Sequence, residues 1–255
     1  MTSAGLKDKA ILIAGAATGL GAATAHRLAA DGARVIVGDL DLEGATRTAA
    51  AITDLGGQAI AAGFDIADDA SVRDLVAAAT AAYGGLDAVH VNAGAMHLTR
   101  ADTDVVDMDL DVWDQVIAVN LRGHMLVTRH AVPELLARGG GVIVYTSSLA
   151  AFTGEARRPA YSVTKAGINA LTRHVASRWG RDGIRANAVA PGLIVTDKIR
   201  DGAPPGLLEK MLARTPSTRH GEEADVAAMV AYLMSDEAAW INGQVINIDG
   251  GTVMR

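Results

Sequence analysis

The chain has 255 residues, of which 50% are apolar, and 23 basic against 29 acidic side chains give it a net charge of −6 at pH 7. This length allows one large domain or two small ones, and the apolar content is ample for a sizeable core and excludes disordered and fibrous classes. The acidic balance argues against a surface for nucleic-acid phosphates or anionic lipid. Cysteine is absent, which excludes disulfides and thiolate chemistry and favours a reducing cytoplasmic setting. No apolar run reaches the roughly 18 residues that suggest a membrane span.

The first informative stretch is "AILIAGAATGLGAATA", residues 10–25. Its basic start, apolar run and small residues resemble a secretion signal. Three glycines, Gly15, Gly19 and Gly21, instead favour a strand, a tight turn and a helix from Leu20 to Asp31. The backbone N–H groups at such a helix start attract phosphate. The remainder of the chain has to decide between these two interpretations.

Short apolar runs recur along the whole chain and alternate with segments of helical periodicity. They begin at Ala10, Arg34, Gln58, Leu86, Gly141, Ile184 and Gln244. Runs that are apolar at successive residues suit strands that are covered on both faces. The sequence therefore predicts an α/β fold, a doubly wound seven-stranded parallel sheet with helices on both faces, as a single domain over residues 1–255. Ligands of such sheets bind beyond the carboxyl ends of the strands.

Two segments depart from this alternation. Residues 192–221 form a long connection that contains "DGAPPG", and we expect a short helix near Leu207–Ala213 within a substrate lid. Tyr161–Arg181 is a long predicted helix that places Tyr161 and Lys165 on one face.

An acidic residue stands at the distance from the glycines that dinucleotide-binding folds use. Asp39 ends the second predicted strand, 18 residues after Gly21, where a carboxylate can hold the ribose hydroxyls of adenosine. The alternative is an ordinary solvated carboxylate at a strand end. A 2′-phosphate beside Asp39 would add like charge, and Ala17, Thr18 and Leu40 carry no cation to offset it. Arg34 is expected at the far end of the strand, so the sequence favours NAD over NADP.

The order and separation of several motifs resemble the short-chain dehydrogenases/reductases, in the single-domain branch of about 250 residues. These motifs are "GAATGLG", "VNAG" from Val91, "VNLRG" from Val119, Ser148, "YSVTK" from Tyr161, "PGLIVT" from Pro191 and "INGQVINIDGG". Ala14 stands where the family often has Thr, and Val91 where it often has Asn. The resemblance covers nearly the whole chain and implies a homotetramer that is assembled through helices 112–138 and 160–181 and the last strand.

The resemblance also implies a set of cofactor-binding residues. Asp65 would meet the adenine edge, Asn92 to Gly94 would line the adenosine side, and Ile194 and Thr196 would face the nicotinamide amide. For Asp65 and Asn92 the alternative is a side chain that stabilises a turn. The full set is Gly15, Thr18, Gly19, Leu20, Gly21, Asp39, Leu40, Asp65, Ile66, Asn92, Ala93, Gly94, Tyr161, Lys165, Pro191, Gly192, Ile194 and Thr196.

Hydride transfer between nicotinamide and a carbonyl or alcohol carbon needs a group that moves the oxygen-bound proton. Tyr161 is the candidate, and we expect the charge of Lys165 to lower its pKa from about 10. Ser148 is expected to donate to the substrate oxygen, with Ser147 as the competitor. Asn120 resembles the residue that holds a water for the proton relay. The alternative for each residue is a structural role. Tyr161 would be a core aromatic and Lys165 a surface charge, while Ser148 would be a turn hydroxyl and Asn120 a buried structural amide.

These residues predict an NAD-dependent oxidoreductase that acts on a secondary alcohol or its ketone, with Tyr161 as acid/base. Two alternatives stay open: an NADPH-dependent reductase of the 3-oxoacyl-thioester type, and a non-catalytic dinucleotide-sensing protein. No histidine spacing suggests a metal site.

Three other features carry less weight. His97 is more readily a loop residue than a substrate contact. The adjacent Arg157 and Arg158 are either surface charges, which we favour slightly, or attract an anionic substrate. The acidic run 101–114 is expected to be a solvated loop that caps the next helix.

Overall fold

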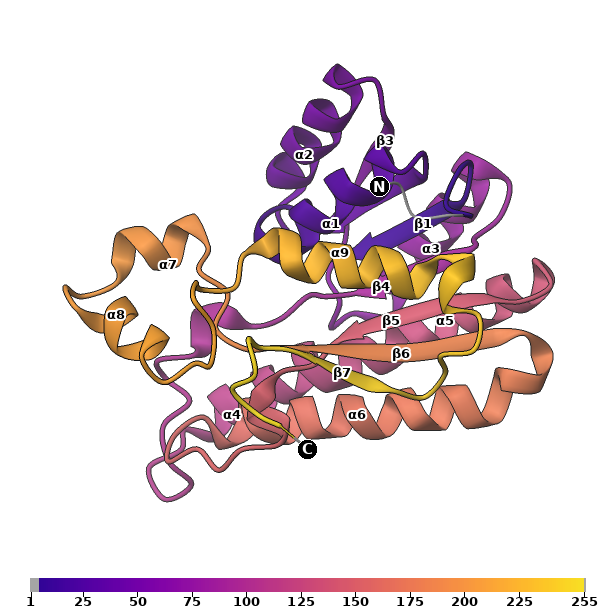
Figure 1. Ribbon diagram of the computed structural model, residues 1–255. Coiled ribbons are helices and arrows are strands. Elements are labelled where there is room, and N and C mark those ends of the chain that lie inside the picture. Colours follow the sequence, from indigo (N-terminus) through magenta and orange to yellow (C-terminus); the bar gives the residue numbers. More distant parts are fainter. Residues whose placement is uncertain (1–4, 255) are drawn as a thin grey trace.

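Seven parallel strands form one sheet at the centre of the molecule, as the sequence predicts (Figure 1). The computed structural model describes residues 5–254, with the backbone alone at 197 and 198, so both ends of the predicted domain, residues 1–4 and 255, lie outside the described residues. The strands are β1 (Ala10–Ala14), β2 (Arg34–Asp39), β3 (Gln58–Gly63), β4 (Ala88–Val91), β5 (Gly141–Thr146), β6 (Ile184–Pro191) and β7 (Val245–Ile248).

Nine α-helices connect these strands in the described part of the chain. They are α1 (Gly19–Ala30), α2 (Leu42–Asp54), α3 (Asp69–Tyr83), α4 (Leu110–Ile117), α5 (Gly123–Ala137), α6 (Pro159–Trp179), α7 (Asp197–Gly202), α8 (Leu207–Leu212) and α9 (Glu223–Met234). None of the helices described has the combination of length and apolar character that crossing a membrane requires.

The strand order is β3-β2-β1-β4-β5-β6-β7, so the direction of winding reverses between β1 and β4. At such a reversal the connections leave β1 and β4 toward opposite faces, which opens a crevice at their carboxyl ends. Asn92 and Ala93, just past β4, both donate their backbone N–H to the carbonyl of Ala14 at the end of β1, at 2.9 and 2.8 Å. The glycine turn and the segment after β4 therefore share one place.

Alternate side chains of each central strand enter two separate cores. In β1, Ile11 and Ile13 pack with α1, α2 and α9 on one face of the sheet. Leu12 and Ala14 pack with α3, α5 and α6 on the other face. All four side chains are fully buried. Both faces are thus covered, which explains why the strands are apolar at successive positions.

The segment between β6 and α9 leaves the sheet and returns to it. Ile194 and Gly221 form an isolated parallel bridge, and the N–H of Val195 donates to the carbonyl of Gly221 at 2.9 Å. Between these two points the chain forms α7 and α8, which stand apart from the sheet in Figure 1. The short helix α8 confirms the one predicted near Leu207–Ala213.

Candidate active site

The glycine turn between β1 and α1 is shaped for a close approach of backbone to ligand. Gly15 and Gly19 have φ angles of +95° and +60°, in the left-handed region that favours glycine. A Cβ on Gly21 would lie 1.9 Å from the carbonyl oxygen of Gly15. Thr18 is the N-cap of α1, but its side chain makes no capping hydrogen bond. The first turn of the helix, which includes Leu20, has no acidic residue. The positive end of this helix thus suits the pyrophosphate of a dinucleotide.

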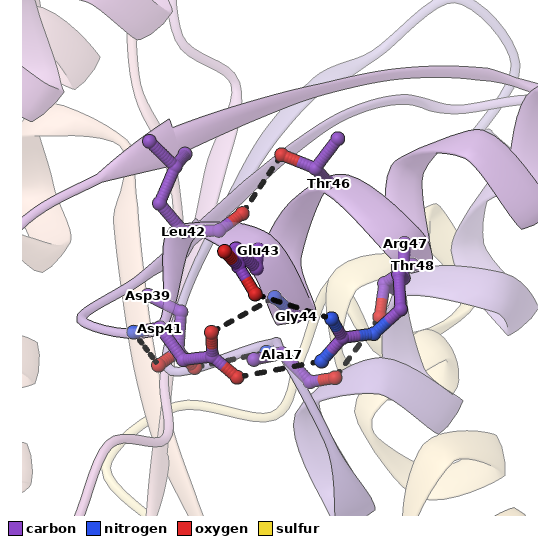
Figure 2. A network of polar contacts seen from close by, with 9 residues as sticks. All are labelled: Ala17, Asp39, Asp41, Leu42, Glu43, Gly44, Thr46, Arg47 and Thr48. Carbon is purple, nitrogen blue, oxygen red and sulfur yellow. Dashed lines mark hydrogen bonds and ion pairs between the residues drawn. The ribbon is translucent and has the colours of Figure 1, made fainter.

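Asp39, at the end of β2, lies beside this turn and is held by two backbone donors (Figure 2). Its carboxylate accepts hydrogen bonds from the N–H of Ala17 at 2.8 Å and from that of Asp41 at 3.0 Å. These bonds fix the side chain at the corner where an adenosine ribose is expected. The next residue, Leu40, is exposed.

One cation near this corner was missed by the sequence reasoning. Arg47 on α2 lies 3.6 Å from the carboxylate of Asp41 and 3.9 Å from that of Glu43 (Figure 2). Helical spacing of Glu43 and Arg47 was the available signal. Two carboxylates face this one guanidinium, so the group of Asp41, Glu43 and Arg47 keeps a net negative charge. Arg34 lies at the opposite end of this strand, as expected, and its side chain donates to the carbonyl of Asp8 at 2.6 Å.

The other predicted cofactor residues follow the carboxyl ends of β3, β4 and β6 and so lie along the same edge of the sheet. Asp65 and Asn92 both stabilise turns: Asp65 accepts from the N–H of Ala67 at 2.8 Å, and Asn92 donates to the carbonyl of Gly15 at 2.7 Å. The set at and after the carboxyl ends of β3, β4 and β6 is Asp65, Ile66, Asn92, Ala93, Gly94, Pro191, Gly192, Ile194 and Thr196.

The structure separates the two serines that follow β5. Ser147 is buried, and its hydroxyl donates to Oδ1 of Asn169 at 2.6 Å, away from Tyr161. Ser148 is the first residue of a short turn and accepts from the N–H of Ala150 at 3.2 Å. Burial raises the pKa of Tyr161, and a hydrogen bond with the Ser148 side chain opposes this rise, so these two hydroxyls are neighbours. Ser148, not Ser147, therefore accompanies Tyr161.

Tyr161 and Lys165 lie one turn apart on α6, with Nζ of Lys165 5.5 Å from the centroid of the phenol ring. Lys165 is buried, which lowers its pKa to about 8, and its ammonium donates to the carbonyl of Thr146 at 2.7 Å. The pKa of Tyr161 is raised in this structure, so the lowering expected from Lys165 does not dominate it. Burial raises that pKa, while Ser148 and the charge of Arg158 oppose the rise.

Asn120 lies in a five-residue π-helical turn, Ala118–Arg122, which joins α4 to α5. Single π-helical turns within longer helices frequently mark functional sites. Oδ1 of Asn120 accepts from the N–H of Ala95 at 2.7 Å, whereas its buried Nδ2 has no acceptor among the described residues. A buried amide N–H requires a partner. Asn120 is thus able to hold a small polar molecule such as water.

Asp102 positions the start of α6, although the sequence predicts a solvated loop around it. That expectation is wrong, because Asp102 is 1% exposed. Its carboxylate accepts from the N–H groups of Ala160 and Tyr161, at 3.2 and 2.9 Å, and so caps α6 from 58 residues away. The only sequence signal was the lack of a capping residue before Pro159. Asp109 does cap the next helix, as predicted.

A glycine turn, a strand-end carboxylate and a Ser–Tyr–Lys group at one sheet edge define the class of a dinucleotide-binding oxidoreductase. A family model described as Enoyl-(Acyl carrier protein) reductase matches residues 15–253. The chain belongs to the short-chain dehydrogenase/reductase family, as its motifs predicted, and its homologues are oxidoreductases.

Three relatives illustrate the range of this similarity. A probable short-chain type dehydrogenase/reductase of Bradyrhizobium diazoefficiens is 42% identical over 245 residues, 96% of this chain and 87% of the relative. Cis-4-hydroxycyclohexanecarboxylate dehydrogenase of Sinomonas cyclohexanicum is 38% identical, over 96% of both chains. A solved 7α-hydroxysteroid dehydrogenase complexed with NADH and 7-oxo glycochenodeoxycholic acid is 32% identical, with a TM-score of 0.91 over 98% of this chain and 96% of that one. The last of these supports a nicotinamide cofactor here.

Proposed function

We propose that this protein is an NAD-dependent oxidoreductase that interconverts a secondary alcohol and its ketone, with Tyr161 as the general acid/base. The observation that carries the proposal is the convergence of Ser148, Tyr161 and Lys165 at the edge of the sheet where Asp39 and the glycine turn also lie. A sheet edge with both a dinucleotide corner and a proton-transfer group suits hydride transfer to or from carbon.

The chain's own residues supply the proton chemistry, while the nicotinamide supplies or accepts the hydride. The phenol of Tyr161 gives its proton to the ketone oxygen during reduction and takes it back during oxidation. Ser148 donates a hydrogen bond to the same oxygen as negative charge develops on it. Asn120 has an amide N–H to spare for a water beyond Lys165, which would exchange the proton with solvent.

Asp39 supports NAD as the preferred cofactor. Its carboxylate accepts from two backbone N–H groups and stands at the ribose corner. A 2′-phosphate about 4 Å away would meet a like charge, which costs about 4 kcal/mol per unit charge at an effective dielectric near 20, before relaxation. Half of that cost is a preference of about 30-fold for NAD.

The relatives' substrates indicate where to begin. One relative's name specifies a hydroxycyclohexanecarboxylate, and another relative was solved with an oxosteroid acid. Both names describe an alcohol or ketone on an aliphatic ring. Cyclic secondary alcohols and ketones are therefore the first compounds to assay for this chain. We propose that segment 192–221 closes over them, because it leaves and rejoins the sheet at the bridge between Ile194 and Gly221.

We also propose that the protein assembles as a homotetramer. Apolar side chains are exposed on the helices that the family resemblance assigns to subunit contacts, Met125 on α5 and Val163 on α6. Trp240, just before the last strand, is 99% exposed. Burial of such side chains against second copies would remove apolar surface from water. Light scattering at micromolar concentration distinguishes a tetramer from a monomer.

The test of the function is a panel of cyclic secondary alcohols and ketones with NAD and NADP, followed by absorbance of the reduced nicotinamide. We expect turnover with NAD, and a fall in kcat of about 100-fold or more in Tyr161→Phe with NADH binding retained. The double variant Asp39→Ala, Leu40→Arg should narrow or reverse the cofactor preference. If Tyr161→Phe turns over as fast as wild type, Tyr161 is not the acid/base. If the double variant keeps the wild-type ratio of kcat/KM for NAD to that for NADP, Asp39 does not set the cofactor preference.

A further inference from the structure

Arg158, directly before α6, has a backbone conformation that is rare for its residue type. Its φ is +67°, and it and Asp8 are the two non-glycine residues with positive φ in the described chain. The following Pro159 normally drives the preceding residue to an extended conformation. Two hydrogen bonds hold Arg158 in place, because its N–H donates to the carbonyls of Asp102 and Thr103, at 3.1 and 2.9 Å. Backbone strain that the surroundings enforce is typical of functional positions.

This conformation sets the guanidinium against the catalytic phenol. Cζ of Arg158 lies 5.4 Å from the centroid of the Tyr161 ring, a distance at which a cation is attracted to an aromatic face. Lys165 lies 5.5 Å from the same ring. Lys165 is buried, however, whereas 34% of the Arg158 side chain is exposed. Arg158 is thus the cation at this ring that a molecule from solvent can reach.

Glu155 uses only part of the hydrogen-bonding capacity of Arg158. One carboxylate oxygen, Oε2, accepts a hydrogen bond from Nε of the guanidinium at 2.8 Å and forms an ion pair with one terminal nitrogen at 2.6 Å. A guanidinium carries five N–H donors in a planar fork. Within residues 5–254 no second acceptor is bonded to this group. The other edge of the fork is therefore available for a second carboxylate, which arginine binds in a bidentate manner.

The neighbouring Arg157 has a different environment. Asp104 accepts backbone hydrogen bonds from Asp107 and Val106, which lower its pKa, and the charge of Arg157 lowers it further. Arg157 is exposed, and its charge acts on the acidic loop that contains Asp104. The two adjacent arginines carry the same charge but face different groups, which makes Arg157 a matched control for Arg158.

We propose that Arg158 is a substrate-specificity residue that binds a carboxylate carried by the alcohol or ketone while the reacting oxygen lies at Tyr161 and Ser148. The inference rests on the proposed function and narrows its substrates to hydroxy acids and oxo acids. A neutral alcohol would leave the open edge of the guanidinium to water. A carboxylate would add a charge-assisted hydrogen bond next to the reacting group, so the acid should be selected over its neutral ester.

The experiment compares 4-hydroxycyclohexanecarboxylate with its methyl ester, which has the same ring and hydroxyl but no charge. The readout is the ratio of kcat/KM for the acid to that for the ester, in which any effect of Arg158 on the proton chemistry of Tyr161 cancels. We expect wild type to favour the acid by about tenfold or more, the scale of one charge-assisted hydrogen bond. Arg158→Gln should abolish this preference, mainly through KM for the acid, while Arg157→Gln should retain it.

Two further variants keep the inference testable if Arg158→Gln does not fold. Glu155→Gln removes the competing carboxylate and should raise the acid-to-ester ratio, and Arg158→Lys should retain part of it. The role of Arg158 is overturned if the acid-to-ester ratio of kcat/KM is near one in wild type, or if it is equal in wild type and Arg158→Gln. In either case, turnover of the ester still supports the proposed oxidoreductase activity. Loss of turnover for every alcohol and ketone with either nicotinamide instead refutes the proposed function itself.

Discussion

Nε2 of His90, on β4, lies 2.9 Å from the hydroxyl oxygen of Thr146, at the end of β5. That hydroxyl donates to Oδ1 of Asn92 at 2.9 Å, and the amide of Asn92 donates to the carbonyl of Gly15 at 2.7 Å. Because the only proton of the hydroxyl points to Asn92, His90 must be the donor and carry its proton on Nε2. A directed chain of hydrogen bonds therefore runs from a buried imidazole to the glycine turn.

This arrangement makes the protein sensitive to acid. Burial lowers the pKa of His90 from 6.5 to about 3. The native state therefore binds fewer protons than the unfolded state between these values. The stability that neutral His90 provides is complete above pH 6.5 and is lost as the pH falls toward 3, with a slope of up to about 1.4 kcal/mol per pH unit.

The variant His90→Gln tests whether the neutral His90 makes the free energy of unfolding fall with pH. Glutamine keeps a donor for Thr146 but does not titrate, so its free energy of unfolding should fall less steeply with acid than that of wild type. Urea unfolding at several pH values between 7 and 4 gives both curves. His124, whose pKa burial also lowers, is present in both proteins and cancels in the difference. Parallel curves for the two proteins would contradict the assignment of a neutral His90.

Replacement of Thr146 by valine should weaken cofactor binding. The change keeps the shape of the side chain but removes the hydroxyl that joins His90 to Asn92. It leaves a buried donor and acceptor unsatisfied, at a cost of about 1–3 kcal/mol in stability. If the loss loosens the Gly15 turn, NAD binds more weakly. Each 1 kcal/mol lost from NAD binding should raise KM for NAD about fivefold.

Thr172→Val is the matched control for this change. Thr172 is fully buried. Its hydroxyl donates within α6 to the carbonyl of Ile168, at 2.8 Å, and so is not part of the chain of bonds that leads to Gly15. We expect it to lower the urea midpoint without a change in KM for NAD. Equal effects of the two variants on KM would show that the chain of bonds does not act on the glycine turn.

The cap that Asp102 provides to α6 should affect both stability and turnover. Asp102→Ala removes the acceptor for the N–H groups of Ala160 and Tyr161, and loss of such a cap costs about 1–2 kcal/mol. Because Tyr161 is one of the two residues held, kcat should fall as well. Asp102→Asn keeps one acceptor oxygen and should recover part of both quantities. Asp104→Ala, in the same loop, should leave kcat unchanged. A normal kcat in Asp102→Ala would confine Asp102 to stability alone.

The sequence was sufficient for features that depend on local chemistry. Strand and helix alternation followed from apolar periodicity, and the glycine turn followed from residues that tolerate positive φ, such as Gly15. Asp39 was found because a fixed length of helix and strand separates it from Gly21. Each of these signals lies within one supersecondary unit, so no distant contact is needed to interpret it.

The features that the sequence did not predict depend on distant contacts. Asp102 caps a helix 58 residues away, a relation that no local spacing encodes. The pKa of Tyr161 depends on burial and on Arg158, whose position follows from an unusual φ that arginine propensities do not suggest. Tertiary structure decided each of these cases, and each lies at the candidate active site.

Two glycines of the turn should respond differently to alanine, because different physical causes require them. A Cβ on Gly21 would lie 1.9 Å from the carbonyl oxygen of Gly15 and 2.9 Å from Cα of Ala16, both backbone atoms that cannot rotate away. At Gly19 the nearest protein atom to a new Cβ is the flexible end of Glu223, 3.9 Å away, so the cost to the protein's own packing is that of a φ of +60°.

Gly21→Ala should therefore displace the turn and abolish NADH binding, whereas Gly19→Ala should leave the protein's own turn in place at a cost of about 1–2 kcal/mol in stability. Fluorescence titration with NADH measures binding, and urea unfolding measures stability, for both variants. The contrast between them carries the argument, since both remove a glycine from the same turn. If Gly21→Ala binds NADH as wild type does, α1 does not need its close approach to Gly15, and the turn is not the phosphate site that its geometry suggests.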